Sequence, residues 1–110
     1  MDNNNLPPKV ATIDQLVTVP EDIKKVIAGK KQATRRNGRY ADKGEVMKLE
    51  GHEFVVTSVY REKLKDMTDE DAIREGYDTL ADYRSFILSM HPGMKWKPEL
   101  QVWVHEYKAV

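Results

Sequence analysis

The last apolar segment of the chain, residues 100–108, constrains the fold most. Val102 and Val104 stand at alternating positions, and Trp103 and Tyr107 occupy positions of the opposite parity. Because successive side chains of a strand point to opposite faces, a strand here carries apolar groups on both faces. The segment therefore predicts a strand that other parts of the chain must cover on both sides.

Helices and strands alternate through the rest of the sequence. A short helix is predicted over 20–28, since Pro20 suits a first helical turn and Gly29 suits a left-handed stop. Thr68 and Thr79 are each followed three residues later by an aspartate, a spacing typical of helix starts. Strands are predicted over 32–36, 45–50 and 52–61. The pattern predicts an α+β domain built on a small, mostly antiparallel barrel or sheet.

Two local features make more specific predictions. Asn37 and Gly38 form a strong turn signal, so a hairpin-like turn is expected there. In the helix that Thr79 opens, the apolar residues recur at helical spacing and predict one buried face. These residues are Tyr83, Phe86, Ile87 and Met90.

The chain has 110 residues, enough for one compact domain. Residues 1–9 contain three asparagines and two prolines and are expected to form a flexible N-terminal arm, followed by a domain over 10–110. No apolar run is long enough to span a membrane, and no secretory signal is visible. With no cysteine, a disulfide framework is excluded and a cytoplasmic location is expected.

Charge is distributed unevenly although the formal net charge is zero. Residues 24–43 hold eight basic residues against the single acid Asp42, whereas residues 62–75 are mainly acidic. Both segments can be solvated faces, which is the common role of charge runs. Alternatively, the basic segment with Tyr40 can hold a phosphate and stack a base, and the acidic segment can bring a carboxylate to the same cleft.

The run IAGKKQATRRNGRYADKGE, residues 27–45, resembles the signature of ASCH domains, which are small PUA-like proteins. The segment LKDMTDEDAIREGY, residues 64–77, is similar to the acidic helix of that family, and a helix closing on HPG is followed by a final strand. The resemblance implies a small PUA-like, mostly antiparallel β-barrel with about three short helices.

Small bacterial members of that family are amidohydrolases that remove the acetyl group of N4-acetylcytidine. The resemblance implies Lys31, Thr34 and Glu75 as catalytic residues. The sequence departs from the family pattern at Glu45, where an aspartate is usual, and at Arg35, where the amidohydrolases carry an apolar residue. The residues expected to bind the substrate or a phosphate are Lys30, Arg35, Arg36, Arg39 and Tyr40.

Amide hydrolysis needs a nucleophile, a base and a donor or cation for the developing oxyanion. Thr34 can be the nucleophile or can orient a water molecule. Lys31 can be a base or the partner of the oxyanion, and Glu75 can activate water. Lys31 and Thr34 are three positions apart, so a regular strand would place them on opposite faces. They converge only if Lys31 lies in a loop before the strand or a bulge intervenes.

Other functions stay open at this stage. A non-catalytic RNA-binding module would use the basic segment to hold phosphates, with Tyr40 or Trp96 stacking a base, and an RNA-cleaving ASCH protein would use the same cleft. The expected partner is therefore a modified nucleoside or RNA. No cofactor is expected. His52, His91 and His105 lack metal-ligand spacing, so we expect no metal and assign them to a turn, a cap and a strand surface.

Overall fold

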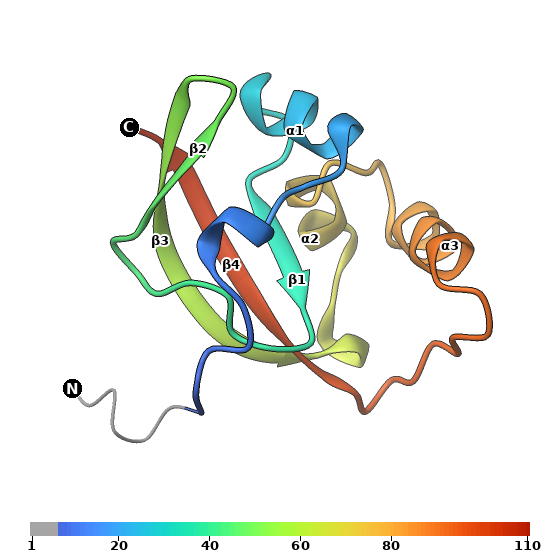
Figure 1. The fold of residues 1–110 in the computed structure, drawn as a ribbon. Helices are drawn as coiled ribbons and strands as arrows, with labels where there is room; N and C mark the ends of the chain where they lie inside the picture. Colours follow the sequence, from blue (N-terminus) through green and yellow to red (C-terminus); the bar gives the residue numbers. More distant parts are fainter. Residues whose placement is uncertain (1–6) are drawn as a thin grey trace.

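The computed structural model describes residues 7–110, and its centre is a curled antiparallel sheet (Figure 1). The strands lie in the order β1-β4-β3-β2, so β1 and β2 are the two edges. Their bounds are β1 (Ala33–Arg36), β2 (Val46–Leu49), β3 (His52–Lys63) and β4 (Gln101–Ala109). All three strand pairs are antiparallel, and the β3–β4 ladder shifts register between Val56 and Ser58.

Strand β4 confirms the prediction from its two apolar faces. It pairs with both β1 and β3 and so occupies the interior of the sheet. Val102 and Val104 are buried on one face, and Trp103 and Tyr107 are buried on the other. The sheet is therefore covered on both sides where β4 runs through it.

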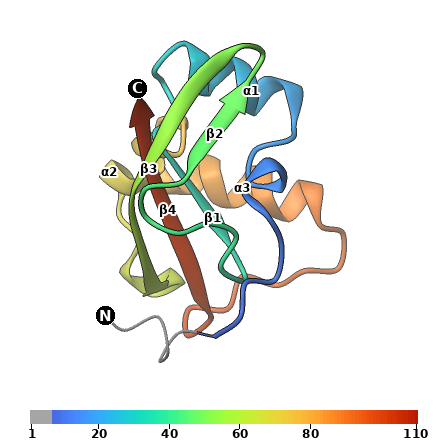
Figure 2. The same ribbon diagram turned by 60° about the vertical axis from the view of Figure 1, so that its left-hand side comes forward.

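Helices α1 (Pro20–Ile27), α2 (Asp69–Arg74) and α3 (Leu80–Met90) complete the predicted α+β architecture, together with the 3-10 turns η2 (Ile13–Gln15) and η3 (Leu64–Asp66). In one core, Val26 of α1 packs with residues of the η2 region and the sheet, and the β2–β3 hairpin curls toward α1 (Figure 2). A second core joins α2 to α3 through Ala72 and Tyr83. The two cores lie on either side of β1.

The helix starts follow from their capping residues. Thr68 and Asp71 form the predicted capping box, and the Thr79 hydroxyl accepts a hydrogen bond from the Asp82 backbone N–H. Gly29 ends α1 with a φ of 79°, and Gly76 follows α2 with a φ of 97°. These two left-handed glycines redirect the chain next to the residues that form the candidate site.

Two local predictions are wrong. The turn at Asn37–Gly38 does not join a hairpin, because β1 pairs with β4 rather than with the next strand in sequence. Of the apolar stripe on α3, only Tyr83 is buried, and Met90 is 49% exposed. The helix packs against α2 through Tyr83, which leaves the rest of the stripe facing a cavity.

Of the predicted N-terminal arm, residues 1–6 lie outside the described part of the chain. The Pro7 carbonyl accepts a hydrogen bond from Arg39, and Lys9 pairs with Glu45 at 3.0 Å. Within residues 7–110, no helix has the length and apolar character to cross a membrane.

Candidate active site

Strand β1 contributes residues to the site from one of its two faces. One face of β1 packs on the core that contains Tyr107, and the other faces α2. Thr34 lies opposite His105, and Arg35 lies opposite Val104. Since successive side chains alternate, Thr34 faces the core that contains Tyr107, whereas Arg35 faces the side of α2.

Lys31 and Glu75 form a buried ion pair although they are far apart in sequence. The Lys31 Nζ donates to Glu75 Oε1 at 2.9 Å and to the Glu75 carbonyl oxygen at 3.0 Å. Their side chains are only 4% and 2% exposed. Lys31 lies in the predicted place, the loop between Gly29 and β1, and Glu75 is the C-cap residue of α2.

Arg35 connects this pair to a second carboxylate. Its Nη1 donates to Glu75 Oε2 at 2.9 Å, and its Nη2 donates to Glu62 Oε1 at 2.7 Å. Burial opposes the charge on Arg35, but the carboxylates of Glu75 and Glu62 outweigh that cost and hold the pKa of Arg35 above its ordinary value. The guanidinium is therefore charged and fixed between two acids.

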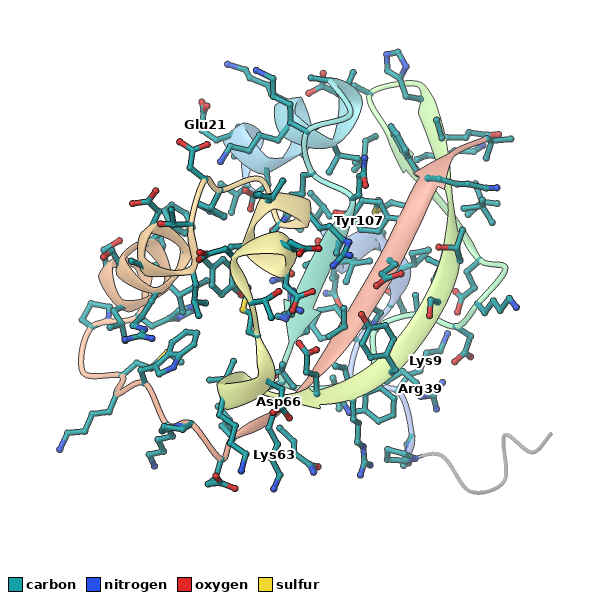
Figure 3. The ribbon with its side chains drawn as sticks, turned by 180° about the vertical axis from the view of Figure 1, so that it is seen from behind. Lys9, Glu21, Arg39, Lys63, Asp66 and Tyr107 are labelled. Carbon is teal, nitrogen blue, oxygen red and sulfur yellow. The ribbon has the colours of Figure 1, made fainter. Side chains whose placement is uncertain are left out.

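The Thr34 hydroxyl forms its hydrogen bond with Tyr107 and not with the Lys31–Glu75 pair. Its Oγ1 lies 2.8 Å from the hydroxyl of Tyr107, which sits near the centre of the molecule in Figure 3. Burial, together with the charge of Glu75, raises the pKa of Tyr107 despite the hydrogen bond with Thr34, so both hydroxyls are neutral. Within residues 7–110, no hydrogen bond joins Thr34 to Lys31 or Glu75.

A cavity of about 640 Å³ lies beside β1. One part of its wall is polar and includes Asp22, Arg35, Arg36, Asn37 and Tyr40. The other part is formed by the apolar stripe of α3 and the segment that follows this helix, including Trp96. The cavity explains why that stripe of α3 is not covered by protein.

The predicted site residues thus separate into four groups, and Thr34, whose hydroxyl is paired with Tyr107, is one group by itself. Lys31 and Glu75 meet, and neither lines the cavity, but Glu75 is hydrogen-bonded to Arg35, which does. Arg35, Arg36 and Tyr40 line the cavity, as a binding role requires.

Lys30 and Arg39 do not line the cavity. Lys30 is exposed, and Arg39 pairs with Asp42 and lies away from Tyr107 in Figure 3. Sequence reasoning missed Glu62 and Asp22 as individual site residues. The acidic run over 62–75 was the available signal for Glu62, because a carboxylate from that run was expected to reach the basic segment.

His105 is not a strand-surface residue, contrary to the sequence interpretation, because it is completely buried. Its Nε2 accepts a hydrogen bond from the Tyr40 backbone N–H at 3.0 Å, and its Nδ1 lies 3.2 Å from the Thr34 carbonyl oxygen. Accepting at Nε2 requires a neutral ring whose Nδ1 donates. Through these two hydrogen bonds, His105 connects β1 to the segment that carries Tyr40.

We expect acidification to destabilise the protein through His105. Burial lowers the pKa of His105 below its ordinary value of 6.5, so the unfolded chain binds the proton first as the pH falls. The free energy of unfolding should decrease from about pH 6.5 downward, by up to about 1.4 kcal/mol per pH unit. Urea unfolding between pH 7.5 and 5.5 measures this slope.

His105→Gln should flatten that slope, whereas His91→Gln, at an exposed position, should keep it. An equal slope in the wild type and His105→Gln would contradict the assignment.

Comparisons with known proteins identify the fold. No family model matches the sequence, and no curated protein is significantly similar to it. The structure is similar to the crystal structure of an ASCH domain from Lactobacillus crispatus JV V101, with a TM-score of 0.66 and 13% identity over 90% of this chain and 78% of that one.

It is also similar to a DUF984 protein from Enterococcus faecalis V583, with a TM-score of 0.60 and 17% identity over 94% of this chain and 76% of that one. The chain has the fold of an ASCH domain.

Proposed function

We propose that the protein is an amidohydrolase that removes the acyl group from N4-acetylcytidine or a related modified nucleoside. The observation that carries the proposal is the buried Lys31–Glu75 pair, which is hydrogen-bonded through Arg35 to the wall of a cavity. An acid, a base and a cation held together beside a cavity are what amide hydrolysis requires.

The cavity suits a nucleoside. Its volume of about 640 Å³ falls within the range of about 300–1,000 Å³ that is usual for small-molecule sites. Tyr40 and Trp96 offer aromatic surfaces for a base, and Asp22 and Asn37 offer hydrogen-bonding groups for its polar edge. An uncharged ligand with one flat aromatic part matches this wall.

The reaction can be written with the residues of this site. Glu75 takes a proton from water, the water oxygen bonds to the amide carbon, and the carbonyl oxygen becomes negative beside the cations Lys31 and Arg35. The C–N bond then breaks and Glu75 returns the proton to the leaving nitrogen, which yields cytidine and acetic acid, and the acid releases its proton to the solvent as acetate. Each Glu75 oxygen already accepts one hydrogen bond from a cation and retains a further lone pair for water.

The charge pairing in the basic segment favours this proposal over an RNA-binding module. Lys31, Arg35 and Arg39 are buried and paired with carboxylates, so their charges are largely balanced inside the protein. Residues that hold the phosphates of RNA instead present unpaired charge at the surface.

Incubation of the purified protein with N4-acetylcytidine tests the proposal. We expect cytidine and acetate to be released in equal amounts, with little dependence on salt because the substrate is neutral. The RNA-binding alternative predicts no release of cytidine, together with RNA binding that weakens steeply as salt is added.

The nucleophile in this scheme is water, since the Thr34 hydroxyl is paired with Tyr107. We therefore expect Thr34→Val to keep turnover within about tenfold of the wild-type rate. The variant should lose about 1–3 kcal/mol of unfolding free energy, because the buried Tyr107 hydroxyl loses its partner. Steady-state kinetics and urea unfolding give both values. A loss of turnover beyond a hundredfold in the folded variant would make Thr34 the nucleophile.

A further inference from the structure

Two oppositely charged side chains of the cavity wall have no charged partner. Asp22 and Arg36 both line the cavity and are half-buried, and within residues 7–110 neither forms an ion pair, with the other or with any third residue. Charges that are taken out of water are normally paired, because desolvation penalises them. Two such charges of opposite sign on one cavity wall indicate a ligand that supplies a partner to each.

The guanidinium of Arg36 is held in place without being neutralised. Its Nη1 donates to the Arg35 carbonyl oxygen at 3.1 Å, and its Nη2 donates to the Leu16 carbonyl oxygen at 2.5 Å. Its central carbon lies 5.7 Å from the centre of the Tyr40 ring, which also lines the cavity. These contacts restrict the side chain but provide no negative charge, so Arg36 suits acceptor atoms of a ligand.

Asp22 lies in the first turn of α1, and its charge acts in the same neighbourhood as that of Arg36. Burial is the main cause that raises the pKa of Tyr107; the charge of Asp22 raises it further, and the charge of Arg36 opposes the rise. Both charged groups are therefore near one buried hydroxyl, although they do not pair with each other. This places an acceptor and a donor group on the same part of the wall.

The charges near this wall decide what kind of ligand fits. Three other cations are already paired with carboxylates, and these are Lys31 and Arg35 with Glu75, Arg35 with Glu62, and Arg74 with Asp71. Asp22 and Arg36 remain. A phosphate would be attracted by Arg36 and repelled by Asp22, whereas a neutral edge that donates at one position and accepts at the next satisfies both groups.

We infer that Asp22 and Arg36 recognise the Watson–Crick edge of a cytosine base, with the Asp22 carboxylate accepting from N4–H and the Arg36 guanidinium donating to N3 and O2. The inference rests on the proposed function for the choice of base, and it deepens that function by naming the residues that select cytosine. A carboxylate is a usual acceptor for the N4 group of cytosine, and the fork of a guanidinium matches two adjacent acceptors. An acyl group on N4 leaves one N–H for Asp22.

Cytidine and uridine test the inference without any reaction, because neither carries an acyl group. Uridine has nearly the size of cytidine, but it presents a carbonyl oxygen in place of the N4 amino group and an N–H donor at N3. We expect cytidine to bind the wild type about tenfold or more tightly than uridine, measured by calorimetry. Equal affinity for the two nucleosides, or binding of neither, would overturn the inference.

Asp22→Asn keeps the shape of the side chain, but its amide can donate to O4 of uridine as well as accept from N4–H of cytidine. The variant should therefore lose most of the preference for cytidine. Glu21→Gln is the matched control, because Glu21 precedes Asp22 on α1 and is exposed, and it should keep the wild-type preference. An unchanged preference in folded Asp22→Asn would overturn the role of Asp22.

Arg36→Met should weaken the binding of cytidine by about tenfold or more, because it removes both donors to N3 and O2. Arg61→Met is the control, since Arg61 is exposed on β3 and does not line the cavity, and it should bind cytidine as the wild type does. Wild-type affinity in folded Arg36→Met would overturn the role of Arg36. If Arg36→Met does not fold, the wild type and Asp22→Asn still decide.

Two further ligands distinguish the base from the sugar and a phosphate. Cytosine lacks the ribose, and cytidine 5′-monophosphate adds an anion. The inference predicts that both bind the wild type within about tenfold of cytidine. Tighter binding of the monophosphate that is lost in Arg36→Met would make Arg36 a phosphate site instead. In Asp22→Asn, weaker binding of cytidine with unchanged binding of cytosine would make Asp22 a ribose site. Either result would overturn the inference.

The same measurements separate this inference from the proposed function. Release of cytidine from N4-acetylcytidine, without a preference for cytidine over uridine, would overturn only the recognition by Asp22 and Arg36. A preference for cytidine that Asp22→Asn loses, without any hydrolysis of the acetyl compound, would support the recognition and contradict the amidohydrolase.

Discussion

Glu75→Gln should lower the turnover of N4-acetylcytidine by about a hundredfold or more, because the amide keeps the shape of the side chain but removes the base. The KM should change little, since the proposal gives Glu75 a role in activating water and none in binding the nucleoside. The variant should also lose about 3–5 kcal/mol of unfolding free energy, because Lys31 and Arg35 lose their shared buried counter-charge. Initial rates and urea unfolding measure the two effects.

Glu70→Gln is the control for this change, because Glu70 lies on α2 and is exposed. It should keep the wild-type rate and stay within about 0.5 kcal/mol of wild-type stability. If folded Glu75→Gln turns over at the wild-type rate, Glu75 is not the base, and its contacts with Lys31 and Arg35 have only a structural role.

Lys31→Met should also lower turnover by about a hundredfold or more. The Lys31 Nζ makes two hydrogen bonds to Glu75, and in the proposed reaction its positive charge favours the oxygen that becomes negative beside Glu75. Removing it also leaves the Glu75 carboxylate with Arg35 as its remaining cation, which should cost about 3 kcal/mol of unfolding free energy. Rates measured below the unfolding transition separate the chemical loss from the loss of stability.

Lys31→Arg makes this test sharper, because it retains a positive charge for Glu75 while changing the donor geometry. It should regain much of the stability but little of the turnover. Lys30→Met is the neighbouring control, since Lys30 is exposed and does not line the cavity, and it should behave like the wild type. A turnover loss in Lys30→Met equal to that in Lys31→Met would indicate that loss of positive charge on this segment, rather than the buried pair, lowers the rate.

Local signals in the sequence were sufficient to predict most of the helices and strands. The helix over 20–28 and the two threonine caps depend on contacts within a few residues, and the structure confirms them. Strand partners depend on distant segments, so the turn at Asn37–Gly38 could not reveal that β1 pairs with β4. Likewise, helical spacing on α3 showed an apolar face but could not show whether protein or a cavity covers it.

As with the helices and strands, part of the candidate site could be predicted from the sequence. The motif resemblance picked out Lys31 and Glu75, and the structure brings them together. The positions of Thr34 and Arg35 on opposite faces of β1 follow from strand alternation, but which face meets Glu75 depends on where α2 packs. The burial of His105 could not be read from its neighbours, because it depends on the segment that carries Tyr40.

The most direct test of the account compares the release of cytidine from N4-acetylcytidine by the wild type and by Glu75→Gln, at equal concentrations of folded protein. The account predicts equal amounts of cytidine and acetate from the wild type and a rate at least about a hundredfold lower from the variant. No release by folded wild type, or equal rates from both proteins, would contradict the claim that the buried Lys31–Glu75 pair hydrolyses an amide.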